Sequence, residues 1–125
     1  MKEVIYTNKA QDPGGMPYSQ AIKAGNTVYV AGQGPFDPET GRLVGSTLDE
    51  QARRAMDNLK AILEEAGSKL DEVVKVTVLL GAGAGFDDFN EIYKEYFKAP
   101  YPARTIGPAD QGFMVQIDAI AVIPS

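Results

Sequence analysis

The chain has 125 residues, 44% of them hydrophobic, and a formal net charge of −5 at pH 7. This size predicts one domain, residues 1–125, with a hydrophobic core of its own. The negative charge argues against nucleic acid as a partner, because phosphate backbones bind basic surfaces. The longest apolar runs are too short to span a membrane, and no basic, apolar leader precedes the first predicted strand. We therefore expect a cytoplasmic protein without a membrane partner.

The sequence contains neither cysteine nor histidine. This composition excludes disulfides, thiolate nucleophiles and sulfur-ligated metal sites, and it removes the usual general base near neutral pH. We expect no metal and no cofactor. Any catalysis would depend on carboxylates, arginine, tyrosine, backbone groups and water.

The first third of the chain reads as short strands joined by turns. Residues 2–7, 19–24 and 27–31 are rich in residues typical of strands, and Gly25-Asn26 between the last two is a hairpin signal. Proline and glycine placement makes 37–41 a turn.

A long amphipathic helix is predicted next. Ser46 or Thr47 can cap its start, and Asp49 and Glu50 in the first turn suit the helix dipole. Gly67 is expected to end it. Apolar residues recur at helical spacing at Leu48, Ala52, Ala55, Met56, Leu59, Ile62, Leu63 and Ala66.

The remaining elements predict a strand at 73–80, a helix at 86–97, and strands at 103–106 and 113–123. This order indicates an α+β fold, a sheet with two helices packed on one face. One side of the last strand is wholly apolar, and the other is mixed. A mixed face either meets a partner chain or stays half-solvated in a monomer. The alternating faces are Phe113, Val115, Ile117, Ala119, Ala121 and Met114, Gln116, Asp118, Ile120, Val122.

Several short motifs together resemble the RidA/YjgF family, the reactive-intermediate (enamine/imine) deaminases. They are Pro17–Ala21, Ala31-Gly32-Gln33, Asp37–Gly41, the helix through Asn58–Leu63, and Pro102-Ala103-Arg104. The resemblance covers nearly the whole chain. It implies a mixed β-sheet of the chorismate-mutase-like RidA fold, assembled as a homotrimer with three sites between subunits. It also implies hydrolysis of 2-imino acids to 2-keto acids and ammonia.

Arg104 is the residue on which the functional hypothesis depends. Its planar fork of donors suits a carboxylate, and the resemblance implies that it binds the carboxylate of the imine or enamine. The alternative is a structural salt bridge at an interface. The resemblance also makes Tyr18 a catalytic candidate, and it assigns ligand contacts to Tyr18, Asn90, Gly32, Gln33, Gly34, Thr105 and Ile106.

Gln116 departs from the family, which has a glutamate here to activate or orient the attacking water. Glutamine is not a base at working pH, although it can hold a water. We expect weakened rather than abolished activity, because imines are reactive electrophiles. Asp118, two residues on, is expected to be structural or interfacial.

Three further departures fall where the family builds its pocket, at residues 11–16, 81–85 and 107–113. Gly34 replaces a larger aliphatic residue, which predicts open space or close backbone approach to a ligand, or else a plain turn glycine. The glycine-rich run at 81–85 lacks the residues of a phosphate loop. The alternative function is therefore a disarmed or remodelled scaffold that binds a small carboxylate ligand.

Overall fold

A computed structural model describes residues 1–124 of the chain. Its two α-helices and six strands agree with the predicted order, and a short 3-10 turn, η1 (Leu70–Glu72), adds to them. No helix in this range is long and apolar enough to cross a bilayer. The elements are β1 (Lys2–Ile5), β2 (Ala21–Ala24), β3 (Thr27–Gln33), α1 (Leu48–Glu65), β4 (Val73–Leu80), α2 (Phe86–Tyr96), β5 (Ala103–Pro108) and β6 (Val115–Val122).

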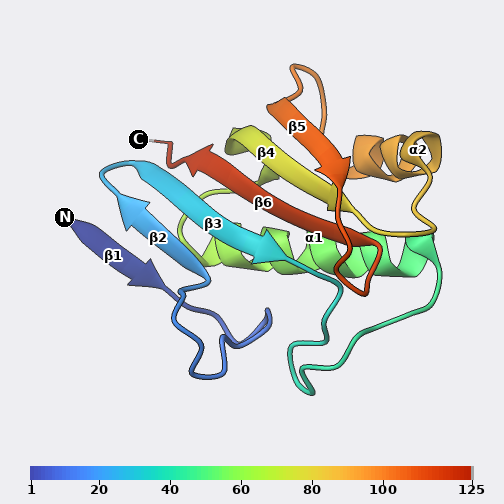
Figure 1. Cartoon of the computed structure of the whole chain (residues 1–125). Coiled ribbons are helices and arrows are strands. Elements are labelled where there is room, and N and C mark those ends of the chain that lie inside the picture. Colours follow the sequence, from blue (N-terminus) through green and yellow to red (C-terminus); the bar gives the residue numbers. More distant parts are fainter. Residues whose placement is uncertain (125) are drawn as a thin grey trace.

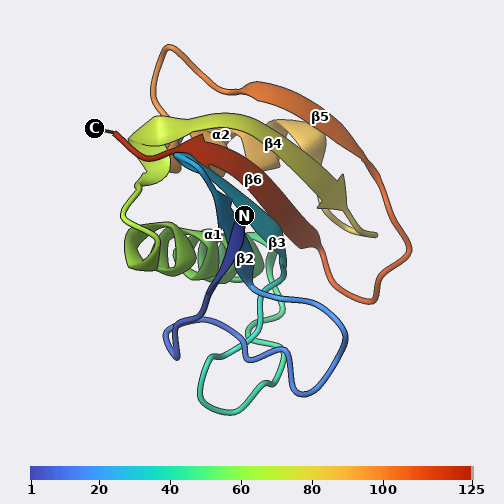
Figure 2. The ribbon, with the colours of Figure 1, turned by 90° about the vertical axis from the view of Figure 1, so that its left-hand side faces the viewer.

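The six strands form one mixed sheet in the order β1-β2-β3-β6-β4-β5 (Figure 1). Only the β4–β5 pair is parallel. The strand order places β5 at one edge of the sheet. Figure 2 shows α1 on one side of the sheet, and buried residues of α2 join the same core. The predicted α+β architecture, with both helices on one face, is confirmed.

The side chains of β6 alternate between the two faces of the sheet. Val115, Ile117, Ala119 and Ala121 are buried, and they pack into the core beneath α1. The alternate residues, among them Gln116 and Asp118, are half-buried on the side without helices. We call these sides the helix face and the open face. Because successive side chains of a strand point to opposite faces, each position on β6 belongs to one of them.

Local signals account for the boundaries of α1. Thr47 is the N-cap, and its side chain and that of Glu50 form the reciprocal hydrogen bonds of a capping box. Gly67 follows the C-cap with φ +86°, a conformation that glycine adopts without strain. Strand boundaries differ more from expectation. Strand β1 ends at Ile5, β3 extends to Gln33, and β6 begins only at Val115.

The loop after β3 is held by a buried amide and two aromatic rings. Asn58, fully buried on α1, donates from Nδ2 to the carbonyl oxygens of Gly34 (3.1 Å) and Phe36 (2.9 Å). The rings of Phe36 and Phe113 meet edge to face with centroids 5.2 Å apart. A Cβ atom on Gly34 would lie 2.7 Å from the Phe36 ring and 3.1 Å from the Phe113 ring. The prediction that Gly34 opens space for a ligand is therefore wrong, because two phenyl rings fill that space.

Gly34→Ala is expected to destabilise the protein by about 1–3 kcal/mol, since the added methyl overpacks against the ring of Phe36. In a Phe36→Ala background the same substitution should cost little, because the ring is gone. Urea denaturation of the four chains of this double-mutant cycle measures the coupling. Equal costs in both backgrounds would mean that the Phe36 ring does not limit the residue at position 34.

Candidate functional site

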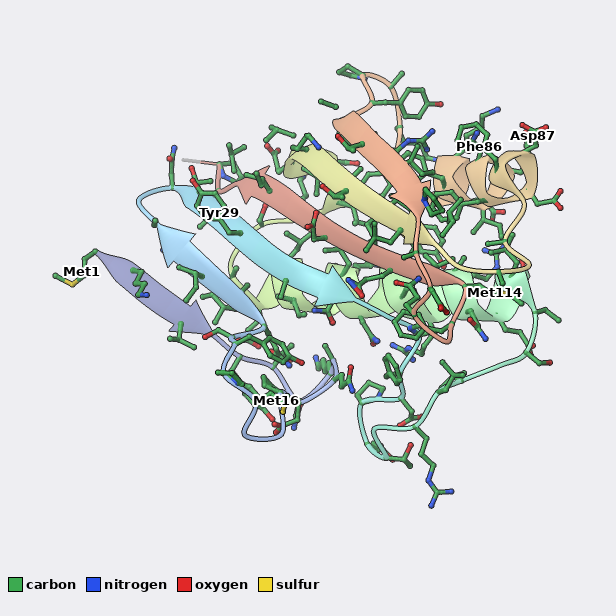
Figure 3. The ribbon with its side chains drawn as sticks, in the orientation of Figure 1. Met1, Met16, Tyr29, Phe86, Asp87 and Met114 are labelled. Atoms are coloured by element: carbon green, nitrogen blue, oxygen red, sulfur yellow. The ribbon has the colours of Figure 1, made fainter. Side chains whose placement is uncertain are left out.

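Arg104 lies on edge strand β5 and faces α2. It pairs in register with buried Val76, so its half-buried side chain is on the helix face. Its Nη1 donates to Oδ1 of Asn90 at 2.8 Å. The guanidinium carbon lies 4.8 Å from the ring centroid of Tyr93 and 5.8 Å from that of Phe86. Figure 3 labels Phe86 at the start of α2, beside β5.

A hollow of about 490 Å³ opens beside Arg104. Within residues 1–124 the salt bridges join Arg53 to Asp49 and Glu95, and Lys94 to Glu91. Arg104 has no carboxylate within 4.0 Å in that part of the chain, although acidic side chains line the same hollow. The lining residues are Asp87, Asn90, Glu91, Tyr93, Lys94, Tyr101, Pro102 and Arg104.

Tyr93 forms the floor beneath Arg104. Its side chain is 5% exposed, and its hydroxyl is buried without a hydrogen-bond partner among the described residues. Burial raises the pKa of the hydroxyl to about 12, an effect that the nearby Arg104 opposes. The hydroxyl is therefore protonated at neutral pH. Sequence reasoning missed Tyr93 as a site residue, although its spacing of three from Asn90 places both on one helix face.

Gln116 of β6 lies on the open face, whereas Arg104 of β5 lies on the helix face, with β4 between the two strands. It pairs with Leu79, whereas its neighbour Ile117 pairs with buried Val78 in the core. Gly32 of β3 lies against it, and a Cβ atom there would come within 2.5 Å of Gln116 Nε2. A glycine at position 32 is what permits this close approach.

Tyr18 is also away from Arg104. Its side chain is 47% exposed, and it lines a second hollow of about 450 Å³ together with Ile22 and Tyr29. Ile22 and Tyr29 are paired residues of β2 and β3, and Tyr29 pairs onward with Ile120 of the open face. Tyr18 and Gln116 therefore belong to the open-face set of candidates.

The other predicted contacts divide between the two faces. Gln33 is buried, and its amide donates to the carbonyl of Ala31 at 3.0 Å. Ile106 packs against the core, while the Thr105 hydroxyl accepts a hydrogen bond from Lys75 Nζ at 3.1 Å. Asp118 accepts from the backbone N–H of Thr77 at 2.9 Å, which agrees with the structural role expected for it. Within one chain, Arg104 thus contacts Asn90, and Gln116 lies against Gly32. The first pair is on the helix face and the second on the open face, so the two pairs do not meet.

The glycine-rich connection between β4 and α2 has a packing explanation at its first residue. A Cβ atom on Gly81 would collide with the carbonyl oxygen of Phe113, and Gly81 N donates to the carbonyl of Met114 at 2.9 Å. The first turn of α2 then carries Asp87 and Asp88, whose negative charges oppose an anion at that helix terminus. Glycine at position 81 therefore allows the backbone of this connection to lie against the backbone of Phe113 and Met114.

Comparisons with known proteins show the family to which the chain belongs. The family model described as Endoribonuclease L-PSP matches residues 9–123. A RutC family protein of Pyrococcus abyssi is 50% identical over 123 residues, covering 96% of each chain. The human 2-iminobutanoate/2-iminopropanoate deaminase is 41% identical over 126 residues, covering 98% of this chain and 90% of the human one.

A solved structure is similar over almost its full length. The crystal structure of Escherichia coli TdcF with bound serine has a TM-score of 0.84 and 32% identity, and the match covers 96% of this chain and 98% of TdcF. Sequence and fold thus agree along nearly the whole chain. The protein belongs to the RidA/YjgF family, the one that the Endoribonuclease L-PSP model describes.

Proposed function

We propose that this chain binds a 2-imino acid, or its enamine tautomer, through Arg104 and accelerates its hydrolysis to the 2-keto acid and ammonia. The main support for this proposal is that Arg104 is half-buried and lacks a carboxylate partner among residues 1–124. A guanidinium withdrawn from water without a counter-charge favours an anionic ligand. The printed name of the human relative, an iminobutanoate and iminopropanoate deaminase, supports an imine as that ligand.

The chemistry requires only water. Water adds to the C=N carbon, the nitrogen takes up protons, and the resulting carbinolamine expels ammonia to leave the keto group. Arg104 would hold the carboxylate throughout, which fixes the imine carbon relative to the attacking water. Gln116 would hold that water through its amide without removing a proton from it.

A complete site of this kind needs more than one chain. Arg104 belongs to the helix face and Gln116 to the open face of the same sheet, so both reach one ligand only if a second chain supplies one of them. The open face also carries an apolar row across β1, β2, β3 and β6, namely Val4, Ile22, Tyr29 and Ile120. Val4 is 64% and Tyr29 49% exposed, which favours burial against another copy. We propose a homotrimer with the open faces inward.

Arg104→Ala should lower kcat/KM for iminopropionate or iminobutyrate by roughly 10- to 100-fold, because a charge-assisted bidentate contact is lost. A dehydratase acting on serine or threonine generates the imine in place, and its decay is followed with and without the protein. Arg53→Ala is the matched control, since Arg53 already pairs with Asp49 and Glu95. Decay at the uncatalysed rate with the wild-type protein would refute the enzyme proposal.

A second candidate function is binding without catalysis. Gln116, which stands in the position of the family's glutamate, favours it because glutamine is not a base at working pH. On this account the trimer holds a small carboxylate ligand at Arg104 and leaves it unchanged.

Gln116→Glu discriminates the two candidates. If the site is a weakened deaminase, the new carboxylate should raise imine hydrolysis by roughly 10²-fold or more, the usual contribution of a general base. Asn26→Asp, which adds a carboxyl group in the exposed turn between β2 and β3, controls for net charge. No gain in Gln116→Glu would favour a pocket rebuilt for binding.

A further inference from the structure

The contacts of Arg104 within its own chain differ from those of a structural ion pair. We infer that Asn90 and Tyr93 are positioning residues that clamp the Arg104 guanidinium in one orientation, leaving its unused edge to a ligand carboxylate. The inference rests on the proposed function in taking Arg104 as the carboxylate-binding group. It adds that the binding half of the site is preformed by α2 and β5 of one chain.

Asn90 supplies a neutral acceptor. Its Oδ1 accepts from Arg104 Nη1 at 2.8 Å, so it fixes one arm of the fork without cancelling the positive charge. The Nε and Nη2 groups have no protein hydrogen bond among residues 1–124. These two nitrogens lie along one edge of the guanidinium plane, the edge that a carboxylate meets with two parallel hydrogen bonds. An aspartate at position 90 would instead form an ion pair with Arg104 and neutralise the charge that the ligand needs.

Tyr93 supplies a fixed surface for the guanidinium. Its ring, 4.8 Å from the guanidinium carbon, stacks on Phe97 at 4.6 Å and meets Phe89 at 5.8 Å. Phe89 and Phe97 are almost completely buried, so the ring of Tyr93 has little room to move. A cation held against an immobile aromatic face keeps its orientation at little entropic cost. Phe86, at 5.8 Å but 51% exposed, is a looser neighbour.

The ring of Tyr93, not its hydroxyl, performs this role. The hydroxyl is buried and has no partner among the described residues, which costs stability relative to a phenyl group of the same shape. Phenylalanine at position 93 therefore keeps the clamp, and the protein should become no less stable. An aliphatic side chain at position 93 removes the aromatic face while it still fills the core.

The charged groups around the hollow leave Arg104 available. Lys94 Nζ lies 3.4 Å from Oε1 of Glu91, so these two exposed charges partner each other. Asp87 is also exposed, one turn before Glu91 on the solvent side of α2. None of these carboxylates is within salt-bridge distance of Arg104. The clamp thus consists of an amide and a ring, both uncharged.

The test compares Tyr93→Leu, Tyr93→Phe and Asn90→Asp with Tyr96→Leu, the control for loss of an aromatic residue on the same helix. For imine hydrolysis we expect Tyr93→Leu to raise KM by roughly 5- to 30-fold with a smaller change in kcat. Tyr93→Phe should keep the KM of the wild type, because the aromatic ring is retained. Asn90→Asp should raise KM at least as much while its thermal midpoint is unchanged or higher, because the introduced carboxylate would form an ion pair with Arg104.

A second readout needs no activity. The chain has only four arginines, so the guanidinium signals of Arg104 can be assigned in NMR spectra of the free protein. Slow rotation of this guanidinium is expected in the wild type and in Tyr93→Phe, and fast rotation in Tyr93→Leu. Fast rotation in the wild type, or a KM in Tyr93→Leu and Asn90→Asp equal to that of the control, overturns the clamp. An inactive wild type with a slowly rotating Arg104 would refute the deaminase proposal and support the clamp.

Discussion

The two-residue alternation of a β-strand is the constraint on which this molecule's site depends. Because Val115, Ile117, Ala119 and Ala121 must all face the helices to form the core, Gln116 has to face the other way. The same rule directs Arg104, in register with buried Val76, toward α2. Arg104 and Gln116 therefore lie on different faces of one chain, and the proposed chemistry, which uses both, would need a second chain.

Arg53 and Arg104 show how the surroundings give one residue type two different uses. Arg53 bridges α1 and α2, with both arms on Glu95 and its Nε on Asp49. It is satisfied within the chain, and its exposed ion pairs contribute little beyond local order. Arg104 is held by an amide and aromatic rings, which orient a charge without neutralising it. The two arginines differ only in the groups that the fold places around each guanidinium, and the amino-acid composition does not show this.

Sequence reasoning succeeded where the signal is local. The capping box at Thr47, the glycine at position 67 and the alternation of 115–122 are readable from neighbouring residues, and each describes the structure well. The space beside Gly34 is filled mainly by the ring of Phe36, two residues further along the chain. The sequence did not reveal this because it does not show the direction of that ring, which meets Phe113, from the other end of the chain, edge to face. Helical spacing places Asn90 and Tyr93 on one face of α2, but it does not show that this face meets Arg104 of β5. That contact joins residues of two different elements, so sequence reasoning did not single out Tyr93.

A crystal structure with bound 2-oxobutanoate, the stable keto acid that hydrolysis of 2-iminobutanoate would form, is the sharpest test of ligand binding at Arg104. The account predicts the carboxylate on the Nε and Nη2 edge of Arg104 at about 2.7–2.9 Å, with Nη1 still on Asn90. It also predicts that Gln116 of a second chain faces the keto carbon. A ligand bound away from Arg104, or an Arg104 paired with a carboxylate of a neighbouring chain in place of the ligand, would contradict it.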